Sequence, residues 1–264
     1  YKKFSEPIIS QPKLYGSRNV TKKSGQFTRQ GKPQIVIPHI AESLKSLFQE
    51  YPNLVVDGEL YNHDLRDDFN QITSIARKQK PTEEDKQLSR EKIQFHVYDV
   101  CFLDIPNSPL QDRLDFINEV ISGYEFIQVV KSETVHTQER LDELYGEYME
   151  DGFEGQMIRT LGSVYDNKRS KSLLKRKQFI DDEFEIYDLE EGKGNWTGKA
   201  KKVYCRKKDG TEFKAGIKGS MEYCTELLEN KESYIGKMGT IRFQELTPDG
   251  IHRFGVLYAI RDYE

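Results

Sequence analysis

Apolar and polar positions follow two spacings over the first 180 residues of the chain. Short runs rich in β-branched and aromatic residues predict strands at 52–61, 93–103, 124–131, 153–160 and 172–180. Between the earlier strands, apolar residues recur every three or four positions, as on one face of a helix. Three such faces are predicted: Ile40, Leu44, Leu47 and Phe48; Leu114, Ile117 and Ile121; and Leu141, Leu144, Tyr145 and Tyr148. Asp151-Gly152 predicts the end of the last helix.

The pattern changes near residue 181, where short strands and Gly-rich turns replace the mixed order. Asp209-Gly210 is typical of a hairpin turn, and one short helix is predicted around 220–229. About five strands with one helix suit a small barrel such as the OB fold. We therefore expect two domains, 1–180 and 181–264. The charged segment 78–92 is expected to form an exposed loop or helix.

Composition excludes several classes of protein. The chain has 264 residues, 36% of them apolar, and a mean hydropathy of −0.75. Its longest aliphatic runs, such as Ile35-Val36-Ile37, are far shorter than the roughly 18 residues of a membrane-spanning helix. The 15 Tyr and 14 Phe residues supply large side chains for a core, which argues against disorder. We expect a folded protein that does not enter a membrane.

Cysteine usage favours a reducing compartment. Cys101, Cys205 and Cys224 lie far apart and the five histidines are scattered, so neither a disulfide framework nor a zinc site is expected. The opening residues, Tyr1-Lys2-Lys3-Phe4, lack the apolar segment of a signal peptide. They also lack a Met, so we expect a trimmed start. The cysteine usage and the lack of a signal peptide predict a cytoplasmic protein.

The net charge of −4 argues at first against a nucleic-acid partner. The charges are segregated, however: 168–177 and 199–208 each hold six basic residues and no acidic one, whereas 181–191 holds seven acidic residues. Without the two basic decads the chain has 28 basic and 44 acidic residues, a balance of −16. A single charged run is usually a solvated face. Two such runs around one acidic strand favour a local site for an anionic partner.

Several short segments have side chains suited to chemistry. In Gln11-Pro12-Lys13-Leu14-Tyr15-Gly16-Ser17-Arg18, Pro12 restricts the chain before the lysine and Gly16 permits a turn or a close backbone approach to a ligand. Asp57-Gly58-Glu59 ends a buried-looking strand and is either a turn or a pair of functional carboxylates. Lys175 and Lys177 share one face of a strand, where like charges are destabilising unless an anion such as a polyphosphate neutralises them.

In order and spacing, these segments resemble the motifs of the covalent nucleotidyltransferase superfamily of ATP-dependent DNA ligases, RNA ligases and mRNA capping enzymes. The matching segments, for motifs I, Ia, III, IIIa, IV and V in that order, are Lys13–Arg18, Thr28–Lys32, Asp57–Glu59, Tyr98-Asp99, Glu154–Arg159 and Leu174–Lys177. Asn230–Met238 and the ending Arg253-Phe254 to Glu264 are similar to the OB domain of small viral and phage DNA ligases, which favours a DNA ligase over the other members. A minimal two-domain ligase is therefore expected.

The resemblance implies an α+β nucleotidyltransferase (ATP-grasp-like) domain of antiparallel sheets with helices, followed by an all-β OB domain. It also implies a three-step reaction. Lys13 takes AMP from ATP, AMP passes to the 5′-phosphate of a nick, and the 3′-hydroxyl displaces AMP. ATP and Mg²⁺ are the implied cofactors. The implied partner is nicked double-stranded DNA, bound by a monomer in the cytoplasm, or in the host cytoplasm for a virus or phage.

The resemblance assigns a role to individual residues as well. Tyr98 is expected to stack on adenine, Glu59 to bind the ribose, and Glu154 with Glu59 to hold the metal ion. Lys175 and Lys177 are expected to hold the α-phosphate. The other nucleotide-binding residues are Gln11 and Arg18. DNA is expected to contact Arg18, Arg29, Lys201, Lys202, Arg206, Lys207 and Lys208.

One residue departs from the family pattern. Motif I reads K-x-D-G-x-R, and Tyr15 stands where a carboxylate is expected to orient water on the metal ion. Either Tyr15 impairs the formation of lysyl-AMP and leaves a protein that binds nicks without sealing them, or Glu59 and Glu154 suffice to hold the metal. An RNA ligase or a capping guanylyltransferase of the same superfamily is the other alternative.

Overall fold

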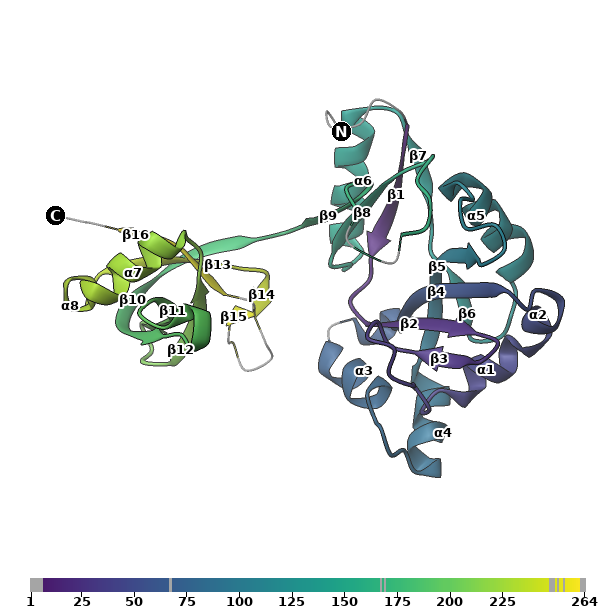
Figure 1. Ribbon diagram of the computed structural model, residues 1–264, viewed down its shortest axis with the longest axis horizontal. Coiled ribbons are helices and arrows are strands. Elements are labelled where there is room, and N and C mark those ends of the chain that lie inside the picture. The colour runs from purple at the N-terminus through teal and green to yellow at the C-terminus, as the bar shows by residue number, and fades with distance from the viewer. Residues whose placement is uncertain are drawn as a thin grey trace. The chain divides into compact units, whose positions relative to one another are not determined.

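The computed structural model describes residues 7–66, 68–166, 168, 170–246, 250, 252–253 and 255–261. Arg169, Phe254 and residues 262–264, which belong to segments quoted above, lie outside the described residues. The chain divides into two compact units, Tyr1–Arg176 and Lys177–Glu264 (Figure 1). The expected boundary between residues 180 and 181 falls inside β10 (Ile180–Glu191), the first strand of the second unit.

Two sheets form the framework of the first unit (Figure 1). The first contains, in order, β7 (Glu133–Val135), β1 (Ile8–Lys13), β8 (Gly155–Thr160) and β9 (Leu173–Lys177). The second contains β3 (Gly25–Phe27), β2 (Ser17–Lys22), β4 (Leu54–Tyr61), β5 (Gln94–Phe102) and β6 (Ile127–Val129). Its strands pair antiparallel except β5 and β6, which run parallel. Only three residues join β1 to β2, so the chain passes directly from one sheet to the other.

Helices cover these sheets. They are α1 (Pro38–Ser43), α2 (Lys45–Glu50), α3 (Phe69–Ala76), α4 (Glu83–Lys92), α5 (Leu110–Phe116) with a π-helical turn at Ile117–Ile121, and α6 (Gln138–Glu150). The three predicted apolar faces lie in α1 with α2, in α5 with the turn that follows it, and in α6. The predicted face 40–48 is split between α1 and α2 at Leu44. The charged segment 78–92 contains α4, which begins with a capping box between Thr82 and Asp85. The charged segment is therefore largely helical.

Each sheet has its own apolar core. The core of the second sheet includes Ile40 and Leu47 from the helices and Val56 and Phe95 from the strands, all fully buried. A smaller cluster packs α6 on the first sheet through Leu141, Leu144, Tyr148, Ile8, Val135 and Ile158. Ile9 of β1 belongs to the core of the second sheet and Phe153 packs against both cores, so apolar contacts also join the two sheets.

The second unit is a closed barrel of β10, β11 (Ala200–Arg206), β12 (Glu212–Ile217), β16 (Val256–Arg261) and β13 (Met238–Phe243). Around it lie α7 (Met221–Glu229), the short α8 (Lys231–Tyr234) and the two-stranded sheet of β14 (Glu245–Leu246) and β15 (His252–Arg253). The predicted barrel, its helix at 220–229 and the turn at Gly210 are confirmed. The barrel interior is apolar, with Ile186, Val203 and Ile241 fully buried.

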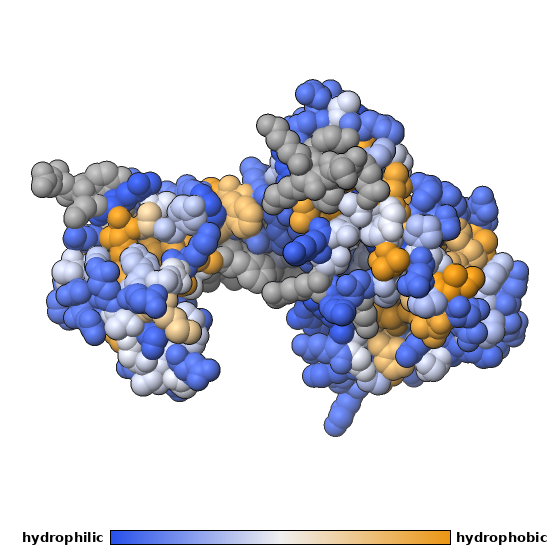
Figure 2. All heavy atoms as spheres, turned by 45° about the horizontal axis from the view of Figure 1, so that its top comes forward, coloured by the Kyte–Doolittle hydropathy of each residue, from blue (hydrophilic) through white to orange (hydrophobic). Residues whose placement is uncertain are grey.

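The visible surface of both units is mostly hydrophilic, with separate apolar patches (Figure 2). Exposed large apolar side chains such as Leu103, Ile105 and Val164 are scattered along the sequence, as on most folded proteins. Within the described ranges, no helix is long and apolar enough to cross a membrane.

Candidate active site

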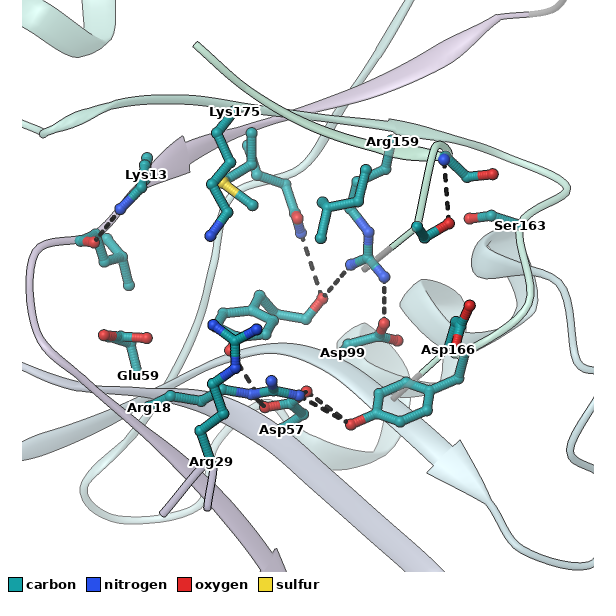
Figure 3. A pocket seen from close by; sticks show the side chains of 18 of the residues that line it. Lys13, Arg18, Arg29, Asp57, Glu59, Asp99, Arg159, Ser163, Asp166 and Lys175 are labelled. Atoms are coloured by element: carbon teal, nitrogen blue, oxygen red, sulfur yellow. Dashed lines mark hydrogen bonds and ion pairs between the residues drawn. The ribbon is translucent and has the colours of Figure 1, made fainter. Parts of the chain in front are cut away.

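A pocket of about 670 Å³ in the first unit is lined from both of its sheets. β1, β8 and β9 of the first sheet contribute Lys13, Arg159 and Lys175. β2, β4 and β5 of the second sheet contribute Arg18, Asp57, Glu59, Tyr98 and Asp99. The segment after β8 adds Ser163–Asp166. Lys13 and Lys175 extend from one side of the pocket and Arg29 from the other (Figure 3). The pocket therefore combines cationic and anionic side chains in one space.

Lys13 is the last residue of β1 and forms an ion pair with Glu154. The antiparallel register of β1 and β8 places Lys13 opposite Gly155, and the backbone N–H of Glu154 donates to the Lys13 carbonyl at 3.0 Å. Both side chains are largely buried, at 16% and 9% exposure. Strand pairing thus fixes the lysine and the carboxylate together at the edge of the pocket.

Glu59 lies near this pair on β4 and has a strongly perturbed acidity. Burial raises the pKa of Glu59 to about 8, and the carboxylates of Asp57 and Glu154 also raise it, whereas the charge of Lys13 lowers it. An ionised Glu59 is therefore costly in this buried position. An additional cation beside it would favour the ionised form.

Asp57 is the centre of a hydrogen-bond network on the same side of the pocket. Its carboxylate is almost fully buried and pairs with Arg18, whose Nε donates to Oδ1 at 2.8 Å and whose Nη2 donates to Oδ2 at 2.5 Å. The hydroxyls of Tyr98 and Tyr165 donate to the same carboxylate at 3.2 and 2.8 Å. Asp57 raises the pKa of the Arg18 guanidinium, so Arg18 is held as a fixed cation.

Asp99 anchors a second network, deeper in the unit. Arg113 of α5, 1% exposed, donates from Nε to Asp99 Oδ1 at 2.8 Å, and Arg159 of β8 pairs with Oδ2. Arg113 also donates to the backbone carbonyls of Ser108 and Ser163, and Arg159 to that of Tyr98. Asp99 thereby joins β5 of the second sheet to β8 of the first and to α5.

Two glycines allow the strands of this site to approach each other. A Cβ on Gly16 would lie 2.2 Å from the Leu60 carbonyl oxygen, and one on Gly58 would lie 2.4 Å from that of His96. Gly16 therefore serves close contact with β4, whereas the sequence left open a turn or a ligand. Gly58 follows an irregularity in the pairing of β4 and β5, where Tyr98 is the additional residue.

The pocket brings together most of the side chains predicted for the nucleotide site. The predicted nucleotide-site residues that line it are Gln11, Lys13, Arg18, Glu59, Tyr98 and Lys175, and Glu154 joins through its ion pair with Lys13. Arg29, predicted to contact DNA, also lines the pocket. Lys177 is different: it is the first residue of the second unit, and its Nζ donates to Gln244 Oε1 at 3.0 Å. Tyr15 is half-buried with its hydroxyl oxygen enclosed, and it is absent from the residues that line the pocket.

The five basic residues predicted to contact DNA in the second unit have different neighbours. Lys201 is exposed at an irregularity in the pairing of β10 and β11, and its Nζ lies 3.7 Å from the ring centre of Trp196. Lys202 and Arg206 share one side of β11, and Arg206 pairs with Glu212 at 2.9 Å. Lys207 binds the Gly250 carbonyl, and Lys208 is exposed. The basic side chains of the decad are therefore engaged to different degrees by contacts within the second unit.

Sequence reasoning missed several residues of the site. Asp99 and Arg159 belong to recognised motifs, but their pairing depends on the contact between the two sheets. Arg113 stands within a helical apolar pattern, and Tyr165 within the segment between two strands; neither has a signal in the sequence. The one available indication for Arg113 is a basic residue next to the apolar positions 114, 117 and 121 of a helix.

Comparison with known proteins identifies both units. Residues 1–177 match the family model described as ATP dependent DNA ligase domain, and residues 191–261 match the one described as DNA ligase OB-like domain. The DNA ligase of phage T4 is 24% identical over 75% of this chain and 43% of its own length. That of Haemophilus influenzae is 24% identical over 96% of this chain and 88% of its own length. The chain thus spans less than half of the phage T4 enzyme.

Solved structures agree on the fold. A Lig E DNA ligase superimposes with a TM-score of 0.79 at 23% identity, covering 99% of this chain and 96% of that one. The Chlorella virus DNA ligase-adenylate gives a TM-score of 0.53 at 24% identity, covering 98% and 95%. The predicted fold class, a nucleotidyltransferase domain followed by an OB domain, is confirmed.

The Asp99 network leads to a stability prediction. Asp99→Ala removes the partner of two buried arginines, so the free energy of unfolding of the first unit should fall by about 3–5 kcal/mol. Urea unfolding followed by circular dichroism measures this loss, while the fluorescence of Trp196 reports on the second unit. Asp104→Ala, at an exposed position after β5, is the matched control. A loss below about 1 kcal/mol, as for a surface ion pair, would contradict this account of Asp99.

The raised pKa of Glu59 predicts a pH-dependent difference in stability. The folded chain keeps a proton on Glu59 up to a pKa of about 8, whereas the unfolded chain releases it near the ordinary value of 4.5. Compared with Glu59→Gln, the natural chain should therefore lose stability as the pH rises from 4.5 to 8. Melting temperatures of the two proteins should coincide at pH 4 and diverge above pH 8, with the variant higher. The exposed Glu119→Gln should show no such divergence.

Proposed function

Because the chain belongs to the ATP-dependent DNA ligase family, we propose that it seals nicks in duplex DNA through AMP bound covalently to Lys13. The observation that supports this most directly is the position of Lys13. It is a largely buried lysine at a pocket that also contains Lys175, Arg18 and Glu59. Such a pocket has a nucleophile and the cations that a triphosphate requires in one space.

The proposed reaction has three steps in which each bond formed replaces one broken. Lys13 Nζ, after losing a proton, attacks the α-phosphorus of ATP, and pyrophosphate leaves. The AMP is then transferred from nitrogen to an oxygen of the 5′-phosphate at the nick. Finally the 3′-hydroxyl attacks the phosphorus of the 5′-phosphate at the nick, AMP leaves, and a phosphodiester remains. In this scheme Lys13 bonds to AMP only in the first two steps.

The pocket side chains suit the parts of the nucleotide. Tyr98 offers a ring for adenine, and its hydroxyl is already engaged with Asp57. We assign the ribose to Glu59, the α-phosphate to Lys175, and additional polar contacts to Gln11, whose Nε2 donates to Ser132 Oγ at 2.8 Å. Lys177, which donates to Gln244, is assigned to phosphate binding with Lys175 only by the family resemblance.

A divalent cation fits the carboxylates beside Lys13. Mg²⁺ is usually bound by one or two carboxylates together with substrate phosphates. The carboxylate of Glu154 contributes to the raised pKa of Glu59, and a cation beside Glu59 would favour its ionised form. Across the described part of the chain no group of three or more His, Cys, Asp or Glu side chains is suited to hold a metal ion without other ligands. Mg²⁺ would neutralise charge on the phosphate oxygens.

For DNA, we assign Arg18 and the exposed Arg29 to the 5′-phosphate at the nick. In the barrel, the five basic residues named above are proposed to contact the phosphate backbone. Arg206 is already paired with Glu212, so its contribution to DNA binding should be smaller than that of Lys202. Backbone contacts of this kind carry no sequence preference.

Nick sealing tests the proposal. With a labelled nicked duplex and ATP, the natural chain should seal the nick, and Lys13→Ala should lower the rate about a thousandfold or more. The same variant should still seal a nick whose 5′-phosphate already carries AMP, because Lys13 is not needed for the third step. Lys23→Ala, at an exposed turn of the same unit, is the control. Sealing of the ordinary nick by Lys13→Ala at the natural rate would refute the proposal.

Tyr15 supports a second candidate, a protein that binds nicks but adenylylates itself slowly. A carboxylate at this position should help to organise the metal site, so Tyr15→Asp should raise the rate of label transfer from α-labelled ATP to the protein about tenfold. Tyr15→Phe keeps the ring and should leave the rate unchanged. A slower Tyr15→Asp would contradict this role, and labelling from GTP in place of ATP would favour a capping guanylyltransferase.

A further inference from the structure

Asp57 is saturated with hydrogen bonds, and one of its donors comes from outside the sheet that carries it. Arg18 and Tyr98 lie on β2 and β5, the strands on either side of β4. Tyr165 lies in the segment that follows β8 of the other sheet, yet its hydroxyl donates to Asp57 Oδ2 at 2.8 Å. Tyr165 therefore links one wall of the pocket to a carboxylate on the opposite wall.

This link also acts on Arg18. The Nη2 of Arg18 lies 2.5 Å from Asp57 Oδ2 and 3.3 Å from the Tyr165 hydroxyl, and Nε lies 2.8 Å from Asp57 Oδ1. One edge of the guanidinium is thus fully used. Nη1 of Arg18 has no hydrogen-bond partner among the described residues, and Arg18 lines the pocket. The remaining donor of a fixed guanidinium is thereby available to a ligand in the pocket (Figure 3).

The segment that carries Tyr165 is held at a second point as well. The carbonyl of Ser163 accepts a hydrogen bond at 2.9 Å from Nη1 of the buried Arg113. Tyr165 itself is half-buried, and burial next to Asp57 raises the pKa of its hydroxyl, which keeps the phenol protonated as a donor. A Tyr at this position is therefore a rigid support with a permanent hydrogen-bond donor.

We propose that Tyr165 is a positioning residue for nucleotide binding: through Asp57 it fixes Arg18 so that Nη1 meets the bound nucleotide. This inference rests on the proposed function, in which the pocket binds ATP. Tyr165 touches Arg18 and Asp57 and acts through them. Tyr98 supports the other oxygen of Asp57 but also lies where adenine is proposed to stack, so it does not report on positioning alone.

ATP binding without turnover isolates this role. In the Lys13→Ala background, which cannot form lysyl-AMP, calorimetric titration gives the Kd for ATP. Adding Tyr165→Phe removes one hydrogen bond to a charged group and should raise the Kd about tenfold. Tyr124→Phe, a half-buried tyrosine remote from the pocket residues, should leave the Kd unchanged. Equal melting temperatures would show that both variants remain folded.

A double-mutant cycle separates positioning from a general packing effect. Arg18→Lys cannot make the two-pronged contact with Asp57. In that background Tyr165→Phe should change the Kd less than about twofold, because there is no fixed guanidinium to position. An unchanged Kd in the single variant, or losses that multiply in the double variant, would overturn the inference. If the Lys13→Ala parent binds no ATP at all, the proposed function itself fails, a result distinct from normal ATP binding that is insensitive to Tyr165.

Discussion

The burial of Asp99 between two arginines is the interaction on which the first unit depends. Apolar contacts join its two sheets, since Ile9 of β1 belongs to the core of the second sheet and Phe153 packs against both cores, and buried polar groups add to them. Asp99 on β5 accepts from Arg159 on β8 and Arg113 on α5, and these arginines also bind backbone carbonyls on either side. Removing Asp99 leaves two buried guanidinium groups without their carboxylate, which is costly. This tie joins the two sheets that line the pocket.

The same logic explains how so many charges fit in one pocket. Asp57 and Asp99 stand directly opposite each other on β4 and β5, an arrangement that is unfavourable for like charges. Asp57 is neutralised by Arg18, and Asp99 is neutralised by Arg113 and Arg159. Glu59 has no comparable partner, and its raised pKa reflects this. The network thus leaves Glu59, Glu154 and Lys13 beside the space where a metal ion and a phosphate are proposed to bind.

Much of this could be predicted from the sequence, and the limits have physical reasons. Lys13, Glu59, Tyr98 and Lys175 were identified because their motifs are local and keep fixed order. Strand alternation and motif V group Lys177 with Lys175, but neither reveals that the chain enters the second unit there. The contacts of Arg113 and Tyr165 form only when segments distant in the sequence meet, so no local pattern predicts them. The irregularity of β11 at Lys201 likewise depends on its pairing with β10, which the local sequence does not show.

The central claim is that the tie between the sheets places a nucleophilic Lys13 against the α-phosphate of ATP. Peptide mass spectrometry after incubation with ATP and Mg²⁺, followed by denaturation at neutral pH, tests it most directly. The account predicts one AMP per chain, on the peptide that contains Lys13, and release of that AMP by acid, as expected for a phosphoramidate. AMP attached to any other residue, or its absence from the natural chain and from Tyr15→Asp alike, would contradict the account.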